Sequence, residues 1–117
     1  MDLPLSDAVM AGDLVFLSGT PPLENGKVHA PEDVKAQTLF IMERINAILK
    51  QYNLTRENLV YVQVFLRSLD DYPAMNEAYE SCISAPYPAR KVIVSELPKD
   101  HVRIEISGIA SIHPKQI

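Results

Sequence analysis

The chain has 117 residues, of which 47% are hydrophobic and 22% are charged, and its formal net charge is -4. This size and composition predict one globular domain over residues 1–117. The acidic balance disfavours nucleic-acid binding, and no apolar run reaches the roughly 20 residues that a membrane-spanning helix needs. The single cysteine, Cys82, and an N-terminus without the features of a secretion signal predict a cytoplasmic location.

The apolar pattern predicts strands and helices in a clear order along the chain. A glycine-containing turn joins the first two strands, and Asn25-Gly26 marks a second turn in a proline-rich stretch. Pro31 opens a long amphipathic helix with Asn53 as its left-handed cap, and Asp71 caps a shorter helix. The predicted strands span residues 5–10, 14–19, 59–67, 89–95 and 102–110, and the predicted helices span residues 31–52 and 71–83.

This order predicts an α+β fold in which two helices pack on one face of a mixed β-sheet. The strands are nevertheless apolar on both faces, since Val62 and Val64 alternate with Tyr61 and Phe65. An apolar sheet face that its own helices leave uncovered needs another surface against it. We therefore expect a homo-oligomer whose sheets pack together, with any site on that face at a subunit boundary.

Arg90 is the first residue with candidate chemistry. It lies near the start of its strand, on the same strand face as Val92 and Val94. A guanidinium partly buried beside two valines needs an anion. Two interpretations are open: Arg90 forms a structural ion pair, or its planar fork binds a substrate carboxylate. Spacing alone favours the ion pair.

Glu105 is the second such residue and lies in the last strand, on the strand face of Arg103 and Ser107. This face is either solvated and ion-paired, or it carries a carboxylate that orients and deprotonates water. In the second case burial and the charge of the arginine would set the pKa of Glu105. The catalytic interpretation requires Arg90 and Glu105 to open into one shared hollow lined by subunits.

Ser18, Gly19 and Asn76 are further candidate ligand contacts. Gly19 ends the second strand, where it either serves a bend or offers its bare backbone N–H to a ligand. Ser18 lacks the Gly-x-Ser-x-Gly context of a nucleophile. Asn76 and Tyr79 are three residues apart and share one edge of the second helix, although Tyr79 is first of all a core candidate.

The sequence predicts neither a metal site nor a cofactor site. His29, His101 and His113 lack the spacing of metal ligands. The chain has no glycine-rich phosphate-binding loop. Cys82 lies on the apolar stripe of the second helix and is expected to be a buried, unreactive thiol.

Six short motifs follow one another along nearly the whole chain. They are Pro4-Leu5-Ser6-Asp7-Ala8-Val9, Leu17-Ser18-Gly19, Asn76-Glu77-Ala78-Tyr79, Pro88-Ala89-Arg90, Leu97-Pro98-Lys99-Asp100 and Ile104-Glu105-Ile106. Together they resemble the RidA (YjgF-like) family, in the order and with the arginine–glutamate separation of that family.

The resemblance implies a chorismate-mutase-like (YjgF-type) fold assembled as a homotrimer, with active sites in clefts between subunits. It implies hydrolysis of reactive 2-imino or enamino acids, such as 2-iminobutanoate and 2-iminopropanoate, to 2-keto acids and ammonium without a cofactor. The carboxylate-binding arginine of the family falls on Arg90, and the water-positioning glutamate falls on Glu105. Ser18, Gly19 and Asn76 line the implied pocket, Gly19 through its backbone N–H.

The chain departs from the family pattern at four positions. Leu5 stands where the family usually has tyrosine, and Asp7 stands where it has glutamine. Val92 replaces a frequent cysteine and is expected to line the substrate pocket, and Ser107 replaces a frequent glutamate. These changes alter the polarity and size of the implied pocket while the arginine and the glutamate are kept. They therefore bear on the substrate more than on the type of reaction.

Two other functions stay open at this point. One is deamination of a larger enamine acid of the aminomuconate type, for which Leu5 would make room. The other is a non-enzymatic module that holds a keto acid or another small carboxylate in the same cleft. The expected partners are a small imino or keto acid and further copies of the chain, and neither nucleic acid nor membrane.

Overall fold

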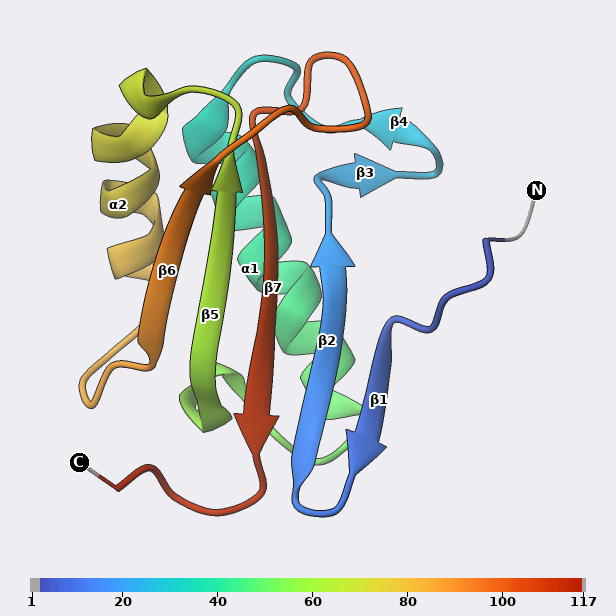
Figure 1. Cartoon of the computed structure of the whole chain (residues 1–117), viewed down its shortest axis with the longest axis vertical. Helices are drawn as coiled ribbons and strands as arrows, with labels where there is room; N and C mark the ends of the chain where they lie inside the picture. The colour runs from blue at the N-terminus through green and yellow to red at the C-terminus, as the bar shows by residue number, and fades with distance from the viewer. Residues whose placement is uncertain (1–2, 117) are drawn as a thin grey trace.

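The computed structural model describes residues 3–116 and contains a five-stranded sheet and a separate two-stranded hairpin (Figure 1). The five strands are β1 (Ala8–Ala11), β2 (Leu14–Thr20), β5 (Leu59–Leu66), β6 (Ala89–Val94) and β7 (Ile104–Ser111). Their order across the sheet is β1-β2-β7-β5-β6. β5 and β6 run parallel and the other neighbours run antiparallel, so the sheet is mixed as predicted.

The small hairpin consists of β3 (Leu23–Glu24) and β4 (Lys27–Val28). Its turn residues, Asn25 and Gly26, have φ angles of 53° and 79°. Two-residue hairpin turns need positive φ at both positions, and Asn-Gly adopts it at the lowest steric cost. The predicted turn at Asn25-Gly26 is confirmed.

Helix α1 (Val34–Lys50) begins later than predicted. A start at Pro31 is wrong because Glu32 has a φ of 66°, which lies outside the right-handed helical region. The helix begins after Asp33, whose side chain accepts a hydrogen bond from the backbone N–H three residues further on. At the other end, Asn53 has a φ of 60°, as expected for the left-handed residue that follows a helix.

Helix α2 (Tyr72–Ser81) follows the short 3-10 turn Leu69–Asp71, and another 3-10 turn, Arg56–Asn58, leads into β5. Asp71 occupies the N-cap position, but its side chain makes no capping hydrogen bond, so the prediction that its side chain caps the helix is wrong. The carboxylate of Asp71 instead pairs with Arg103, at 2.8 Å.

Both helices cover the same face of the sheet, as predicted. Figure 1 shows α1 across the back of the strands and α2 beside β6. Large apolar side chains between these layers are almost fully buried; they include Ile41, Met42, Ile45, Leu49, Val62, Val64, Leu66, Met75, Ile104 and Ile106. Burial of one such side chain contributes about 1.5–3 kcal/mol to stability, which makes this layer the core. In the described part of the chain, no helix is long and apolar enough to cross a membrane.

The opposite face of the sheet, here called the open face, has no helix on it. Pairing places Phe16 opposite Ile109 and Ile109 opposite Tyr61, and it places Phe65 opposite Glu105. These side chains alternate with the buried ones and are only partly buried, and Phe16 is 43% exposed. The predicted apolar character of both sheet faces is therefore confirmed.

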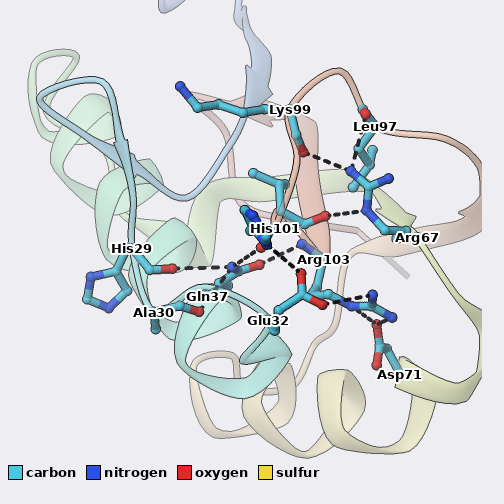
Figure 2. A network of polar contacts seen from close by, with 11 residues as sticks. His29, Ala30, Glu32, Gln37, Arg67, Asp71, Leu97, Lys99, His101 and Arg103 are labelled. Atoms are coloured by element: carbon cyan, nitrogen blue, oxygen red, sulfur yellow. Dashed lines mark hydrogen bonds and ion pairs between the residues drawn. The ribbon is translucent and has the colours of Figure 1, made fainter.

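A polar network fixes the loops at the end of the sheet where β7 begins (Figure 2). Gln37 is fully buried on α1; its Nε2 donates to the backbone carbonyls of His29, Ala30 and His101, and its Oε1 accepts from the Arg103 N–H. A buried amide whose donors and acceptor are all used holds its partners in one arrangement. Gln37 thus ties the segment before α1 to the start of β7.

Candidate active site

Arg90 lies on β6, the strand at one edge of the sheet, and it points to the helix-covered face. It is paired across the parallel β5–β6 ladder with Val62, which is 1% exposed beneath the helices. Residues opposite one another in a ladder project from the same face of the sheet. Arg90 therefore lies between β6 and α2, at the edge of the molecule's core.

The guanidinium of Arg90 contacts two tyrosines of α2. Its Nη2 donates a hydrogen bond to the hydroxyl of Tyr72 at 3.1 Å. Its Cζ lies 5.0 Å from the ring centre of Tyr79 and 5.9 Å from that of Tyr72. Among residues 3–116, no carboxylate forms an ion pair with Arg90. A structural ion pair for Arg90 is thus not found in this part of the chain.

A hollow of about 260 Å³ opens beside Arg90. Its walls are largely apolar or aromatic, with a few polar groups, and they include Asn76, Tyr79, Tyr87 and Pro88. Asn76 and Arg90 lie together here, as the prediction of a shared ligand requires. Val92 lies two residues further along β6, packs against the buried core and does not line this hollow.

Glu105 lies near the start of β7 and points to the open face. Its neighbour is Gly19: a Cβ built on Gly19 would lie 3.0 Å from the carboxyl carbon of Glu105. The β2–β7 register shifts between Leu17 and Thr20, which marks an irregularity around Ser18 and Gly19. Such a bulge re-aims the residues within it. The structure therefore brings together Gly19 and Glu105, which the resemblance assigns to one site.

Ser18 contributes its hydroxyl to the structure of this region. Its Oγ donates to the backbone carbonyl of Ser6, and its N–H donates to the carbonyl of Asp7 at 3.0 Å. These bonds hold the segment before β1 beside β2. The hydroxyl proton is thus engaged with the backbone.

Burial raises the pKa of the Glu105 carboxyl above its usual value, because the partly desolvated carboxylate is less stable than its protonated form. A carboxyl with a raised pKa exchanges protons closer to neutral pH, which suits a proton-transferring group. Burial also raises the pKa of Tyr79 to about 12, against the smaller opposing effect of the Arg90 charge. Tyr79 therefore stays protonated.

Arg90 and Glu105 do not meet within one chain. The ladder partner of Arg90 is Val62 on the helix-covered face, whereas the partner of Glu105 is Phe65, three residues along the same strand. Alternation of side chains puts these two positions on opposite faces of the sheet. The shared hollow that the catalytic interpretation requires is therefore not formed within a single chain.

The structure defines two clusters in place of one pocket. The arginine cluster comprises Arg90, Asn76, Tyr72 and Tyr79, and the glutamate cluster comprises Ser18, Gly19 and Glu105. The sequence predicts an edge of the second helix shared by Asn76 and Tyr79, with Tyr79 first of all a core candidate, and it does not single out Tyr72. The i, i+7 spacing of Tyr72 and Tyr79, with Asn76 at i+4 between them, was the available signal, because it aligns all three on one helix face.

No group of three or more His, Cys, Asp or Glu side chains in residues 3–116 is arranged to hold a metal ion. Cys82 is a free thiol of intermediate exposure at the end of α2. Cys82 packs against the core and is only partly buried, in place of the buried thiol that was expected, because α2 ends at Ser81 and leaves Cys82 at its terminus.

Residues 2–112 match the family model described as Endoribonuclease L-PSP. The match covers the whole sheet and both helices, and with them the arginine cluster and the glutamate cluster. The chain belongs to this family, which is the RidA (YjgF-like) family that its motifs resemble.

Curated relatives in this family carry deaminase names. The chain is 34% identical over 113 residues to the 2-iminobutanoate/2-iminopropanoate deaminase of Dermatophagoides farinae, with 93% of this chain and 86% of the relative covered. It is also 34% identical over 110 residues to the 3-aminoacrylate deaminase RutC of Acinetobacter baylyi, with 93% and 87% covered.

The fold matches solved structures of the family closely. The structure of E. coli TdcF with bound serine superposes with a TM-score of 0.87 at 31% identity, covering 97% of this chain and 91% of that one. These likenesses support the imine and enamine deaminase class for the family to which the chain belongs.

Proposed function

We propose that the chain hydrolyses small 2-imino and enamino acids, of the 2-iminobutanoate and 2-iminopropanoate type, to 2-keto acids and ammonium. The observation that carries this proposal is that the guanidinium of Arg90 is held in place without an ion-pair partner among residues 3–116. Its guanidinium is held by two tyrosines beside a hollow, and no carboxylate within residues 3–116 is paired with it. A fixed planar guanidinium of this kind binds a carboxylate through two parallel hydrogen bonds.

In the proposed reaction, Arg90 holds the carboxylate and so fixes the adjacent C=N carbon for attack by water. Glu105 accepts a proton from the attacking water as the C–O bond forms and passes it to the nitrogen, which gives a carbinolamine. It then takes the remaining hydroxyl proton as the C=O bond forms and passes it to the departing nitrogen as the C–N bond breaks. One water is consumed and one ammonia is released, so no electron donor or acceptor is needed. An enamino acid enters the same route once a proton has moved to its β-carbon.

Gly19 and Asn76 complete the proposed site. Gly19 offers its backbone N–H to the ligand and leaves room for the Glu105 carboxyl, which any side chain at this position would crowd. Asn76 shares the hollow with Arg90 and presents an amide that can both donate and accept. Ser18 acts by holding the segment around residues 6–7 in place.

The proposed active site is completed between two copies of the chain. Within one copy Arg90 and Glu105 point to opposite faces of the sheet, so they can act on one substrate only if neighbouring copies contribute one each. The partly exposed aromatic and aliphatic side chains of the open face support such an assembly. We propose a homotrimer, as the family resemblance implies, because head-to-tail contacts in a ring bring unlike surfaces together.

The names of the two deaminase relatives support small substrates. The name of one relative contains two short imino acids, 2-iminobutanoate and 2-iminopropanoate. The name of the other contains a short enamino acid, 3-aminoacrylate. Although the family model is described as an endoribonuclease, the net charge of -4 argues against RNA as a partner of this chain. The free Cys82 suits the reducing cytoplasm that we propose as its location.

Release of ammonia from freshly generated 2-iminobutanoate tests the proposal. The chain should accelerate it, and Arg90→Ala should abolish the acceleration. Arg44→Ala is the matched control, because Arg44 lies over the Phe40 ring and outside both clusters. Full activity of Arg90→Ala would contradict the role of Arg90, and tight binding of 2-ketobutyrate without imine turnover would instead indicate a binding module.

A further inference from the structure

Tyr72 makes the directional contact that sets the orientation of the Arg90 guanidinium. Its hydroxyl accepts the hydrogen bond from Arg90 Nη2 at 3.1 Å, and no other hydrogen bond of this guanidinium is found within residues 3–116. We propose that Tyr72 is a positioning residue, which acts through Arg90 to present the planar fork to the substrate carboxylate. This inference rests on the proposed function of Arg90 and names a further residue that determines how tightly Arg90 binds the substrate carboxylate.

Tyr79 cannot supply the same constraint. It contacts Arg90 through its ring face, with Cζ 5.0 Å from the ring centre. A cation over a ring is attracted without a strong preference for how the guanidinium turns in its own plane. The Tyr79 hydroxyl is buried and has no hydrogen-bond partner in the described chain, so it does not reach Arg90. A hydrogen bond, by contrast, weakens steeply as its angle departs from linearity.

The position of Tyr72 is itself fixed through Asp71, the residue before it. Asp71 Oδ2 accepts a hydrogen bond from Arg103 Nε at 2.8 Å and forms an ion pair with Arg103 Nη2 at 2.8 Å (Figure 2). Pro73 follows in the first turn of α2 and restricts the backbone on the other side. The N-terminus of α2 is thus anchored to the start of β7. Tyr72 therefore presents its hydroxyl to Arg90 from a fixed base.

This arrangement leaves the ligand-facing part of the fork free. A guanidinium carries five N–H donors, and the bond to Tyr72 uses one. The remaining donors stay available to a carboxylate while rotation of the group is restricted. Restricting the group before binding lowers the ordering cost that the ligand must otherwise offset, which strengthens binding without a new contact.

Tyr72→Phe tests the inference, because it removes only the hydroxyl and keeps the ring that packs beside Arg90. We expect the Kd for 2-ketobutyrate, measured calorimetrically on the assembled protein, to rise about five- to tenfold, as for loss of one hydrogen bond. The KM for 2-iminobutanoate should rise by a similar factor with kcat changed less than about twofold, since uniform binding is lost. The midpoint of thermal unfolding should stay near that of the wild type.

Tyr52→Phe is the matched control, because the Tyr52 hydroxyl likewise makes one hydrogen bond, which it donates to the Ala8 carbonyl at 3.3 Å, and Tyr52 belongs to neither cluster. It should leave Kd and KM unchanged. Unchanged Kd and KM in Tyr72→Phe would overturn the inference and leave the proposed function standing. A fall in kcat accompanied by a lower midpoint of thermal unfolding would do the same. Binding of 2-ketobutyrate without imine turnover would refute the proposed function, while the Kd comparison would still decide the role of Tyr72. A wild type that neither binds nor turns over these carboxylates would overturn both.

Discussion

Gly19 lies so close to Glu105 that a side chain at position 19 would crowd the Glu105 carboxyl. A Cβ at this position would lie 3.0 Å from the carboxyl carbon of Glu105 and 3.2 Å and 3.3 Å from its two oxygens. The obstructing atoms belong to the end of a side chain and not to backbone, so the protein can accommodate a methyl group by moving the carboxyl. Gly19 thereby determines where Glu105 holds its carboxylate.

Gly19→Ala should accordingly lower kcat while the protein stays folded. The variant keeps the backbone N–H at position 19, so the change isolates the displacement of Glu105. The Glu105 carboxyl has to move by a few tenths of an ångström to clear the new Cβ, and since a misplacement of about 1 Å costs on the order of 100-fold in rate, kcat should fall several-fold. Steady-state kinetics on 2-iminobutanoate, with thermal unfolding in parallel, measure both quantities. Unaltered kcat in a folded Gly19→Ala protein would contradict the placement of Glu105 in the site.

Glu105→Gln should raise the free energy of unfolding at neutral pH and remove most of the activity. Burial raises the pKa of Glu105 in the folded state above its unfolded value. Its contribution to stability is therefore complete below the unfolded pKa and is lost as pH rises through the folded pKa. The neutral amide of Glu105→Gln does not ionise, so the variant does not lose this stability as pH rises. Urea unfolding of both proteins near pH 7 and near pH 4 should show a gain for the variant only at the higher pH.

The loss of rate in Glu105→Gln is expected to be about 10²- to 10⁴-fold, the usual contribution of a general acid–base group. An equal stability gain at both pH values would show that desolvation of the carboxylate is not the cause. Retention of full activity would remove Glu105 from the mechanism.

The acid limb of the pH profile of kcat/KM should have a midpoint above 4.5, the ordinary pKa of a glutamate carboxyl. Glu105 must be ionised to accept the proton of water, and burial raises its pKa. This limb should disappear in Glu105→Gln, whose residual activity has no carboxyl to titrate at that position. A pH series on the wild type and the variant measures the shift. An acid limb that is identical in both proteins would assign it to another group.

Tyr79→Phe should stabilise the protein slightly. The Tyr79 hydroxyl is buried without a hydrogen-bond partner among residues 3–116. Burial of an unsatisfied polar group costs about 1–3 kcal/mol, so its removal should raise the free energy of unfolding by about 1 kcal/mol. The pKa of Tyr79 is raised to about 12, so the gain should not vary with pH through the neutral range. Denaturant unfolding checks it, and destabilisation would reveal a partner for the hydroxyl.

Local patterns in the sequence predict much of the fold. The order of elements, the turn at Asn25-Gly26 and the two apolar faces of β5 follow from short-range composition and alternation. The start of α1 does not, because the positive φ of Glu32 is accompanied by its backbone bond to His101, 69 positions further along the chain by residue number. Contacts of that range leave no trace in a local window.

Local sequence patterns also fail to predict how the two parts of the candidate site lie relative to each other. Alternation correctly groups Arg90 with Val92 and Glu105 with Ser107 on their own strands. It says nothing of how the face of β6 relates to that of β7, because this depends on the register of both strands with β5 between them. The motifs found the residues of both clusters, and only the sheet pairing separates Arg90 from Glu105.

Subunit complementation tests the central claim, that Arg90 and Glu105 of different copies serve one active site. Arg90→Ala and Glu105→Gln proteins should each be inactive alone, and co-expression with two affinity tags should yield mixed assemblies. In a three-membered ring each mixed assembly has one intact site, so a random mixture should recover about a quarter of wild-type activity. Purified mixed assemblies that show no more activity than the two parent variants would contradict a site shared between copies.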